Sequence, residues 1–398
     1  MSHFFFNIYQ NTFFSIHISN YQILTAYHFL TKRMTKAPNT SYLKQLDGLR
    51  FIAVTMVLID HWSGDALGFP ISYLGVCMFF VLSGFLITRI LLQAKEKDET
   101  LQRSHGFSLK QFFIRRTVRI FPIYYLTIFI LFLVNEPPIR EKIWWYLTYS
   151  TNIYIAIKQT WLGSSDHLWS LAVEEQFYLF FPFIIFFTHT RYLTKILFGF
   201  IGFSVLLRLF FFLNGTAWMT PYVLMPTCLD AFGIGGLLAY FFFNKNEKFK
   251  AFITNKFWLA LSLILYVGIV IWGKQFPEGH NIITVVFLRL FESFFSLFMV
   301  GNAAYSFGGV TKIILESRIS VYLGRTSYGI YIYHKFIYNA YHSSPSHPVV
   351  RVLNKLPVIA ENLPLKIIFL YLITIAVATV SWFLIEKPIN LWKEKFGY

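Results

Sequence analysis

Long apolar runs separated by short polar loops make up most of this chain. Eleven of these runs reach or approach the roughly 20 residues that an α-helix needs to cross a hydrocarbon core. They fall near residues 50–66, 71–93, 120–135, 143–158, 168–188, 195–213, 228–243, 257–273, 282–302, 319–340 and 365–386. We therefore expect an all-α fold in the form of a polytopic membrane helical bundle.

The charges in the loops distinguish between ten and eleven spans. The 94–119 loop is strongly basic and is expected to be cytoplasmic, which also puts the N-terminus inside. The 143–158 run is polar at 148–152, and if it only re-enters or lies at the outer surface, the later basic residues all fall inside. The pattern predicts about ten transmembrane helices with both termini cytoplasmic and residues 342–350 outside.

Composition supports a membrane protein and excludes several other classes. The chain has 398 residues, of which 56% are hydrophobic and 14% charged, and its mean hydropathy is +0.53. The net charge of +16 lies mainly in short loops and indicates no nucleic-acid partner. The two cysteines, Cys77 and Cys228, give neither a disulfide framework nor a metal-ligand spacing. No metal or prosthetic group is expected, and membrane lipids are the expected surroundings.

Three segments divide the chain. Residues 1–45 lack the apolar core of a signal peptide and are interpreted as an N-terminal extension. An ordinary-looking N-terminus begins at Met34, so the part before it is a candidate product of an upstream start choice. Residues 46–390 form the predicted transmembrane domain, and residues 391–398 form a predicted cytoplasmic tail.

The stretch LDGLRFIAVTMVLIDHW carries the first candidate chemistry. Ten residues separate Arg50 from His61, so the two side chains lie about 16 Å apart along a helix. His61, with Asp60 beside it, is then expected near mid-membrane, where ionisable side chains are costly and usually functional. Glu174 and Glu175 in DHLWSLAVEEQFYLFFP are expected at a similar depth. A general-base pair and a structural ion pair both remain open, and either Asp60 or a glutamate is a candidate to orient His61.

Two further motifs flank this stretch. Ser83-Gly84 interrupts a very apolar run, where small residues favour close helix packing and a hydroxyl is also suited to line an acyl channel. Arg115, Arg116 and Arg119 precede the third span. They serve either as a topology signal or as a paired guanidinium face for a phosphate-rich cofactor, and we favour the cofactor.

The remaining polar residues in the spans are candidates for lining a substrate site or channel. Arg289 and Glu292 lie three apart on one helix face and are expected to satisfy one another. Arg208 and Asp230 flank one outer loop, so they are expected either to pair or to face a polar cavity. The full candidate set is His167, Trp169, Arg208, Asp230, Arg325, Tyr328, Tyr331 and His334.

Taken together, these motifs resemble the acyltransferase 3 family of bacterial integral-membrane O-acyltransferases. The spacing from Arg50 to His61 is similar to the family's arginine–histidine motif. FFVLSGF, RRTVRIFPIYY, HLWSLAVEEQFYLFFP, LGRTSYGIYIYHKFI and FLIEKPI follow in the family's order. The resemblance covers about residues 45–390 and also implies ten spans.

The resemblance implies an enzyme of the bacterial cytoplasmic membrane that moves an acyl group, usually acetyl from cytoplasmic acetyl-CoA, to a hydroxyl of an extracytoplasmic glycan. By position, it implies that His61 is the catalytic histidine with Arg50 as its motif partner. It also implies that Arg116 and Arg119 contact coenzyme A and that Glu174 or Glu175 is the motif glutamate. No hydrolase-like domain is expected after Tyr398, unlike in some relatives, so a separate partner that completes the transfer stays open.

Several alternatives remain at this point. A proton-coupled transporter would use a similar set of His, Glu and Arg in its spans, although no internal repeat is visible. A non-catalytic membrane sensor would tolerate the loss of His61. The sequence names neither the glycan nor the acyl group, leaves direct transfer and a covalent intermediate both open, and indicates no oligomeric state.

Overall fold

The computed structural model describes residues 42–276, 280–342, 350–351, 355 and 357–393. Most of the predicted extension (1–45), most of the tail (391–398) and most of the 342–350 segment lie outside the described residues. Residues from Lys44 onward form one compact unit, which contains all the helices described below. The division into extension, transmembrane domain and tail stays a prediction.

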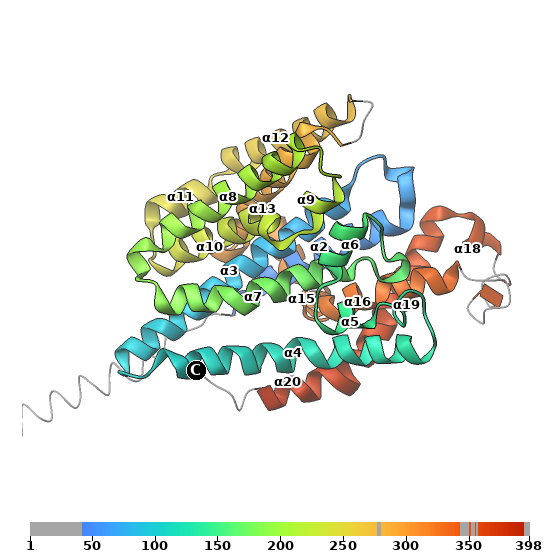
Figure 1. The fold of residues 1–398 in the computed structure, drawn as a ribbon, viewed down its shortest axis with the longest axis horizontal. Coiled ribbons are helices and arrows are strands. Elements are labelled where there is room, and N and C mark those ends of the chain that lie inside the picture. Colours follow the sequence, from blue (N-terminus) through green and yellow to red (C-terminus); the bar gives the residue numbers. More distant parts are fainter. Residues whose placement is uncertain (1–41, 277–279, 343–349, 352–354, 356, 394–398) are drawn as a thin grey trace, which may run out of the picture. The chain divides into compact units, whose positions relative to one another are not determined.

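The described residues are mostly helical and contain no strand, which confirms the predicted helical bundle (Figure 1). The α-helices are α2 (Lys44–Ser63), α3 (Ile71–Thr100), α4 (His105–Leu133), α5 (Ile143–Leu147), α6 (Thr151–Lys158), α7 (Leu168–Phe187), α8 (Leu193–Leu213), α9 (Met219–Val223), α10 (Leu229–Phe243), α11 (Glu247–Thr254), α12 (Lys256–Lys274), α13 (Leu288–Tyr305), α14 (Gly309–Glu316), α15 (Arg318–Arg325), α16 (Ser327–Tyr341), α18 (Pro357–Glu361), α19 (Leu363–Ser381) and α20 (Lys387–Lys393).

Short 3-10 and π segments connect several of these helices. The 3-10 segments are η1 (Gly64–Leu67), η2 (Gly163–Ser165), η3 (Thr190–Tyr192) and η4 (Met225–Cys228), and the π segments are η5 (Ile283–Phe287) and η6 (Trp382–Glu386). Each π segment continues directly into an α-helix, so η5 joins α13 and η6 joins α19 to α20.

Eight helical stretches of the described chain are long and apolar enough to cross a membrane, judged by length and composition alone. They contain α3, α4, α7, α8, α10, α12, α13 and α19. Two further helices match predicted spans without meeting that test, because α2 carries several charges and α16 has only 15 residues. With these two the number would be ten, and the exact count and the orientation of the termini stay predictions.

Two of the predicted spans are each divided into two helices. The 143–158 run forms two short helices, α5 and α6, with the polar residues at their junction, as expected of a segment that does not span. The 319–340 run is expected to be one helix, but it is divided into α15 and α16 at Thr326. The Thr326 hydroxyl donates to the carbonyls of Tyr322 and Leu323, which ends α15 locally.

Helix α3 lies at the centre of the bundle and packs against α2, α7, α10 and α13 (Figure 1). Its contact with α10 is the closest, because Gly84 faces the backbone of Phe232 and Gly235 faces the backbone of Val81. A Cβ at either glycine would overlap a backbone carbonyl of the other helix. The small residues therefore permit an approach that no larger side chain would allow.

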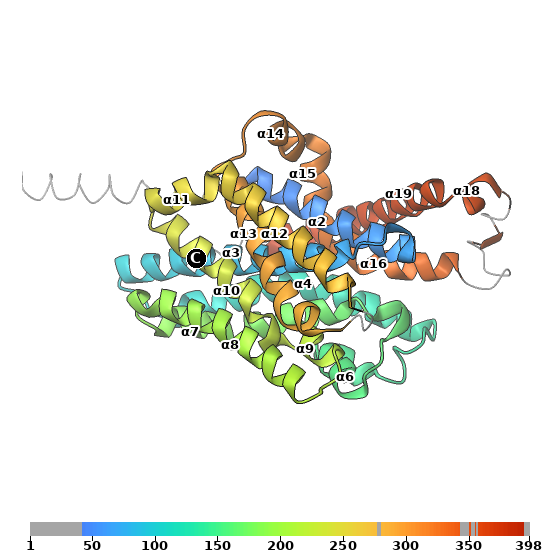
Figure 2. The same ribbon diagram turned by 90° about the horizontal axis from the view of Figure 1, so that it is seen from above.

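Helix α2 is packed just as closely at its Arg50 end, where α14 and α15 lie beside it (Figure 2). Gly48 faces the backbone of Leu315, and Gly324 of α15 faces the backbone of Asp47. Because both contacts are backbone against glycine, the rotation of α2 about its own axis is fixed. That rotation decides which way Arg50 and His61 point.

The charged turn between α3 and α4 is also ordered by specific bonds. The buried Asp98 accepts hydrogen bonds from Arg103 (2.6 Å) and from the hydroxyl of Ser108 (2.7 Å). Lys95 donates to the carbonyls of Ile185 and Thr188 at the end of α7, where a cation satisfies unpaired carbonyls. These bonds fix the start of α4, the helix that carries the arginine cluster.

Candidate functional site

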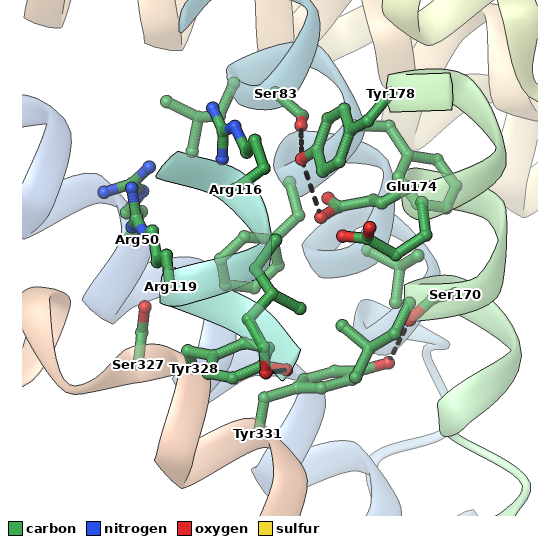
Figure 3. Close-up of a pocket in the computed structure, with 17 residues that line it drawn as sticks. Arg50, Ser83, Arg116, Arg119, Ser170, Glu174, Tyr178, Ser327, Tyr328 and Tyr331 are labelled. Carbon is green, nitrogen blue, oxygen red and sulfur yellow. Dashed lines mark hydrogen bonds between the residues drawn. The ribbon is translucent and has the colours of Figure 1, made fainter. Parts of the chain in front are cut away.

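A pocket with three arginines lies where α2, α3, α4, α7 and α16 meet (Figure 3). We call it the arginine pocket, and its polar lining is Arg50, Ser83, Arg116, Arg119, Ser170, Glu174, Glu175, Tyr178, Ser327, Tyr328 and Tyr331. About 830 Å³ of space, the open mouth included, lies between its walls.

The two sides of the arginine pocket carry opposite charge. Arg50, Arg116 and Arg119 lie on one side, and Glu174 points into the pocket from α7 on the other (Figure 3). Tyr178 donates to Glu174 (3.0 Å) and hydrogen-bonds to the hydroxyl of Ser83. The pocket therefore presents a cluster of guanidinium groups beside a carboxylate that is already hydrogen-bonded.

The arginines are themselves held in place. The guanidinium of Arg116 stacks over the ring of Tyr178, 4.8 Å from its centroid, which leaves its N–H edge available to an anion. Arg50 pairs with Asp47 (3.2 Å), and Asp47 also pairs with Arg325 (3.7 Å). Arg325 thus acts on the pocket through Asp47, because it does not itself line the walls.

Two of the expected cofactor-binding residues do not line the pocket. Arg115 is absent from its walls although its neighbour Arg116 is present. Gly84 faces the backbone of Phe232 and not the cavity, so the close-packing interpretation of the Ser83-Gly84 pair holds for the glycine. Ser83 does line the pocket, as the channel interpretation expects. Tyr328 lines it too and ties α16 to α4 by donating to the carbonyl of Ile120 (3.0 Å).

A second pocket surrounds His61 near the other end of α2. We call it the histidine pocket, and it is lined by His61, Ser72, Tyr73, Val76, Trp161, Asp166, His167, Trp169, Tyr222, Tyr331 and Lys335. Lys335 donates to both carboxylate oxygens of Asp166 (2.7 and 2.8 Å). His167 donates from Nε2 to the carbonyl of Ile332 (3.0 Å), so its ring is fixed.

A chain of hydrogen bonds sets the tautomer of His61. His334, fully buried, has Nδ1 2.5 Å from the carbonyl of Tyr331, and a carbonyl can only accept, so this nitrogen carries the proton. The other nitrogen of a neutral His334 is then an acceptor. It lies 2.9 Å from Nδ1 of His61, which must be the donor. His61 therefore has its lone pair on Nε2, the arrangement that a general base requires.

The structure does not bring His61 together with Glu174 or Glu175. The histidine lines one pocket and the glutamates line the other, and His61 is bonded to His334, with no hydrogen bond to Asp60 between these described residues. The expected pairing is therefore wrong. The spacing along a helix predicts how deep a side chain lies in the bundle. The direction in which it points depends on the rotation of α2 and α7 about their own axes, which the spacing does not give.

The two pockets nevertheless adjoin each other. Of the described residues, Val76 and Tyr331 line both. The hydroxyl of Tyr331 donates to the carbonyl of His167 (3.1 Å) and lies 2.7 Å from the hydroxyl of Ser170. This side chain is a fixed part of the lining that the two pockets share.

The remaining charged candidates have structural partners in part. Arg208 and Asp230 form a buried ion pair (2.6 Å), one of the two arrangements expected for them. Arg289 and Glu292 are not such a pair, contrary to expectation. Arg289 instead donates to the carbonyl of Tyr222 (2.6 Å) and to the sulfur of Cys228 (3.0 Å).

Several lining residues were missed from the sequence although signals for them exist. Tyr178 follows Glu174 by one helical turn, a spacing that allows direct contact. Lys335 is a charge within a predicted span, which alone marks a residue as a functional candidate. Trp161 and Tyr222 carry no such signal, because aromatic residues are common at membrane interfaces.

A multi-pass bundle with an arginine-rich pocket and a histidine-rich pocket on either side of one tyrosine is suited to pass a group between two substrates. The particular class follows from comparison. Residues 43–383 match the family model described as an acyltransferase domain, so this chain belongs to the acyltransferase 3 family. The resemblance drawn from the motifs is confirmed, and the transporter alternative has no support.

Relatives of known name agree with this class. A protein of Staphylococcus aureus (strain COL), provisionally named an O-acetyltransferase, is 29% identical over 392 residues, which cover 90% of this chain and 59% of the relative. The O-acetyltransferase OatA of Staphylococcus aureus (strain NCTC 8325 / PS 47) is 27% identical over 385 residues, with the same two coverages. This chain thus spans about three fifths of the length of these relatives. No solved structure matches it.

Proposed function

We propose that this protein transfers an acetyl group from cytoplasmic acetyl-CoA to a hydroxyl of an extracytoplasmic glycan. The observation that carries the proposal is the pair of adjoining pockets, one with three arginines and one with a histidine in the tautomer of a base. The names of the relatives, O-acetyltransferases, support acetyl as the group and oxygen as the acceptor atom.

The arginine pocket suits the donor. Coenzyme A carries several phosphates, and guanidinium groups bind phosphate by two parallel hydrogen bonds. Arg116 and Arg119 lie one turn apart on α4, and Arg50 faces them from α2, so three guanidinium groups converge on one cavity (Figure 3). The extended arm of the donor would carry its thioester from these arginines toward Tyr331.

The histidine pocket suits the transfer step. Nε2 of His61 would accept the proton of the acceptor hydroxyl while the oxygen of that hydroxyl forms a bond to the thioester carbonyl carbon. The carbon–sulfur bond then breaks, and the departing thiolate takes the proton from the imidazolium. His334 would stabilise the positive charge on His61 between these two proton transfers, since its Nε2 accepts from Nδ1 of His61.

The test compares glycans from cells that carry either the wild-type protein or His61→Ala. We expect mass spectrometry of the surface polysaccharides to find O-acetyl groups with the wild type and none above the deletion strain with His61→Ala. Membrane fractions from both strains should contain equal amounts of protein. Equal O-acetyl content in the two strains would refute the proposal.

A further inference from the structure

A third pocket, beyond the histidine pocket, has no part in the chemistry described so far. We call it the tryptophan pocket, and about 920 Å³ of space lies between its walls, the open side included. Its lining includes Tyr73, Trp218, Tyr222, His280 and Glu292. Of the described residues, Tyr73 and Tyr222 line both this pocket and the histidine pocket, whereas none lines both this pocket and the arginine pocket. The tryptophan pocket therefore adjoins the histidine pocket and not the arginine pocket.

Aromatic rings connect the tryptophan pocket to the histidine pocket. Trp218 and His280 lie with their rings nearly parallel, 4.1 Å apart at their centroids. Tyr222 follows at 5.8 Å from Trp218, and Tyr73 lies 4.9 Å from Tyr222. Flat ring faces are suited to stack against the C–H face of a sugar ring, because such a face is weakly positive and apolar. The row of rings thus offers successive stacking positions that lead toward His61.

Glu292 supplies the polar group that such a site needs. Its side chain is only 3% exposed, and its Oε1 has no hydrogen-bond partner among the described residues. Arg289, one turn before it, uses its guanidinium on the carbonyl of Tyr222 and the sulfur of Cys228. A buried carboxylate oxygen without a donor is costly, so a ligand with hydroxyl donors would satisfy it.

The wall of the tryptophan pocket is rigid before any ligand arrives. Arg208 pairs with Asp230 and also donates to the carbonyls of Thr227 (2.6 Å) and Val286 (3.0 Å). Arg289 fixes the backbone of Tyr222 in the same way. These buried arginines tie α8, η4, η5 and α13 together, which reduces the ordering cost of binding.

We propose that the tryptophan pocket binds a pyranose ring of the acceptor glycan, one or more units away from the hydroxyl that reaches His61. This inference rests on the proposed function, since it takes the acceptor to be a glycan. The ring stacks on Trp218 and its neighbours, and its hydroxyls donate to Glu292. A lipid chain, the other apolar ligand of membrane sites, would leave Glu292 unsatisfied.

The test uses the purified full-length chain in detergent, with chitotriose and maltotriose as soluble sugar probes. The variants are Trp218→Leu and Glu292→Gln. Trp272→Leu is the matched control for the first, because Trp272 is exposed on α12 and does not line the pocket. Glu141→Gln, at an exposed carboxylate, is the control for the second.

Two measurements are made on each protein. Saturation-transfer NMR without any donor reports sugar binding, and we expect at least one probe to bind the wild type and both controls. Each pocket variant should bind that probe about tenfold more weakly, since each loses a stacking face or a charged acceptor. Calorimetry with acetyl-CoA alone should give the wild-type dissociation constant for all five proteins.

The outcomes separate the two proposals. No sugar binding by the wild type, or equal binding by wild type and both pocket variants, overturns the assignment of the tryptophan pocket. Weaker binding of a detergent-dispersed isoprenyl phosphate by the variants, with no effect on sugars, would assign the pocket to lipid and also overturn it. A wild type that binds sugar but not acetyl-CoA would refute the proposed donor and leave the sugar site standing.

Discussion

Replacing His334 by phenylalanine is expected to slow acetyl transfer without weakening the binding of acetyl-CoA. His334 contacts neither donor nor arginine, because it lies behind His61 and is fully buried. Its one contact with the chemistry is the hydrogen bond from Nδ1 of His61 to its Nε2. Phenylalanine keeps a flat ring of similar size and removes this acceptor. The decrease in kcat therefore measures what the hydrogen bond contributes to the transfer step.

The magnitude follows from the charge that His61 gains during transfer. A hydrogen bond to an ionised group contributes about 1.5–3 kcal/mol, which corresponds to about 10- to 150-fold in kcat. His61→Gln removes the base itself and should cost about 10²- to 10⁴-fold, the usual range for general acid–base catalysis. The double variant combines His61→Gln with His334→Phe, so it has no base for a residue at position 334 to assist. The double variant should therefore be no slower than His61→Gln alone.

The assay measures acetyl transfer by purified protein in detergent, with acetyl-CoA binding and thermal unfolding followed in parallel. His342→Phe is the matched control, because His342 caps the exposed end of the same helix α16, donates to the backbone of its own turn and also contacts Lys366. It should turn over at the wild-type rate. A His334→Phe enzyme with wild-type kcat would refute the role of His334, and a fully additive double variant would show that His334 acts elsewhere.

Three further predictions follow from other parts of the bundle. Changing Arg116 and Arg119 together to Ala should weaken acetyl-CoA binding by about 10²-fold or more, and changing both to Lys should restore only part of it, since Lys cannot make a bidentate contact; unchanged binding would return them to the role of a topology signal. In intact cells, Thr160→Cys should react with an impermeant thiol reagent and Glu99→Cys should not. The two native cysteines are buried and should give little background. The opposite result would reverse the predicted orientation of the bundle in the membrane. Gly84→Ala should lower the free energy of unfolding by about 1–3 kcal/mol, because its Cβ would overlap the backbone of α10. A variant as stable as wild type would show that the two helices can move apart at no cost.

Sequence patterns predicted the parts of this protein that depend on composition along one helix. Apolar length predicted the long helices, and the polar centre of the 143–158 run predicted that it does not form one spanning helix, where the structure has the short α5 and α6. The shared face of Arg116 and Arg119 on α4 was predicted because residues three apart in a helix are neighbours on its surface. These are local properties, so one sequence suffices for them.

Contacts between helices could not be predicted in the same way. His61 was expected to meet Glu174 or Glu175, but it meets His334. The choice depends on how far α2 is rotated, and Gly48 sets that rotation through its contact with the backbone of α14. A glycine in an apolar run predicts a close contact but does not name the helix that makes it.

Tyr331, which lines both the arginine pocket and the histidine pocket, also bears on the membrane potential. Each elementary charge that leaks across a membrane dissipates about 2.3 kcal/mol per 100 mV. A water-filled path open at both ends of the bundle would let protons follow that gradient. Tyr331, held by Ser170 and by the backbone of His167, lies where the two pockets adjoin. A side chain held at that junction leaves less room for the continuous water that protons would follow.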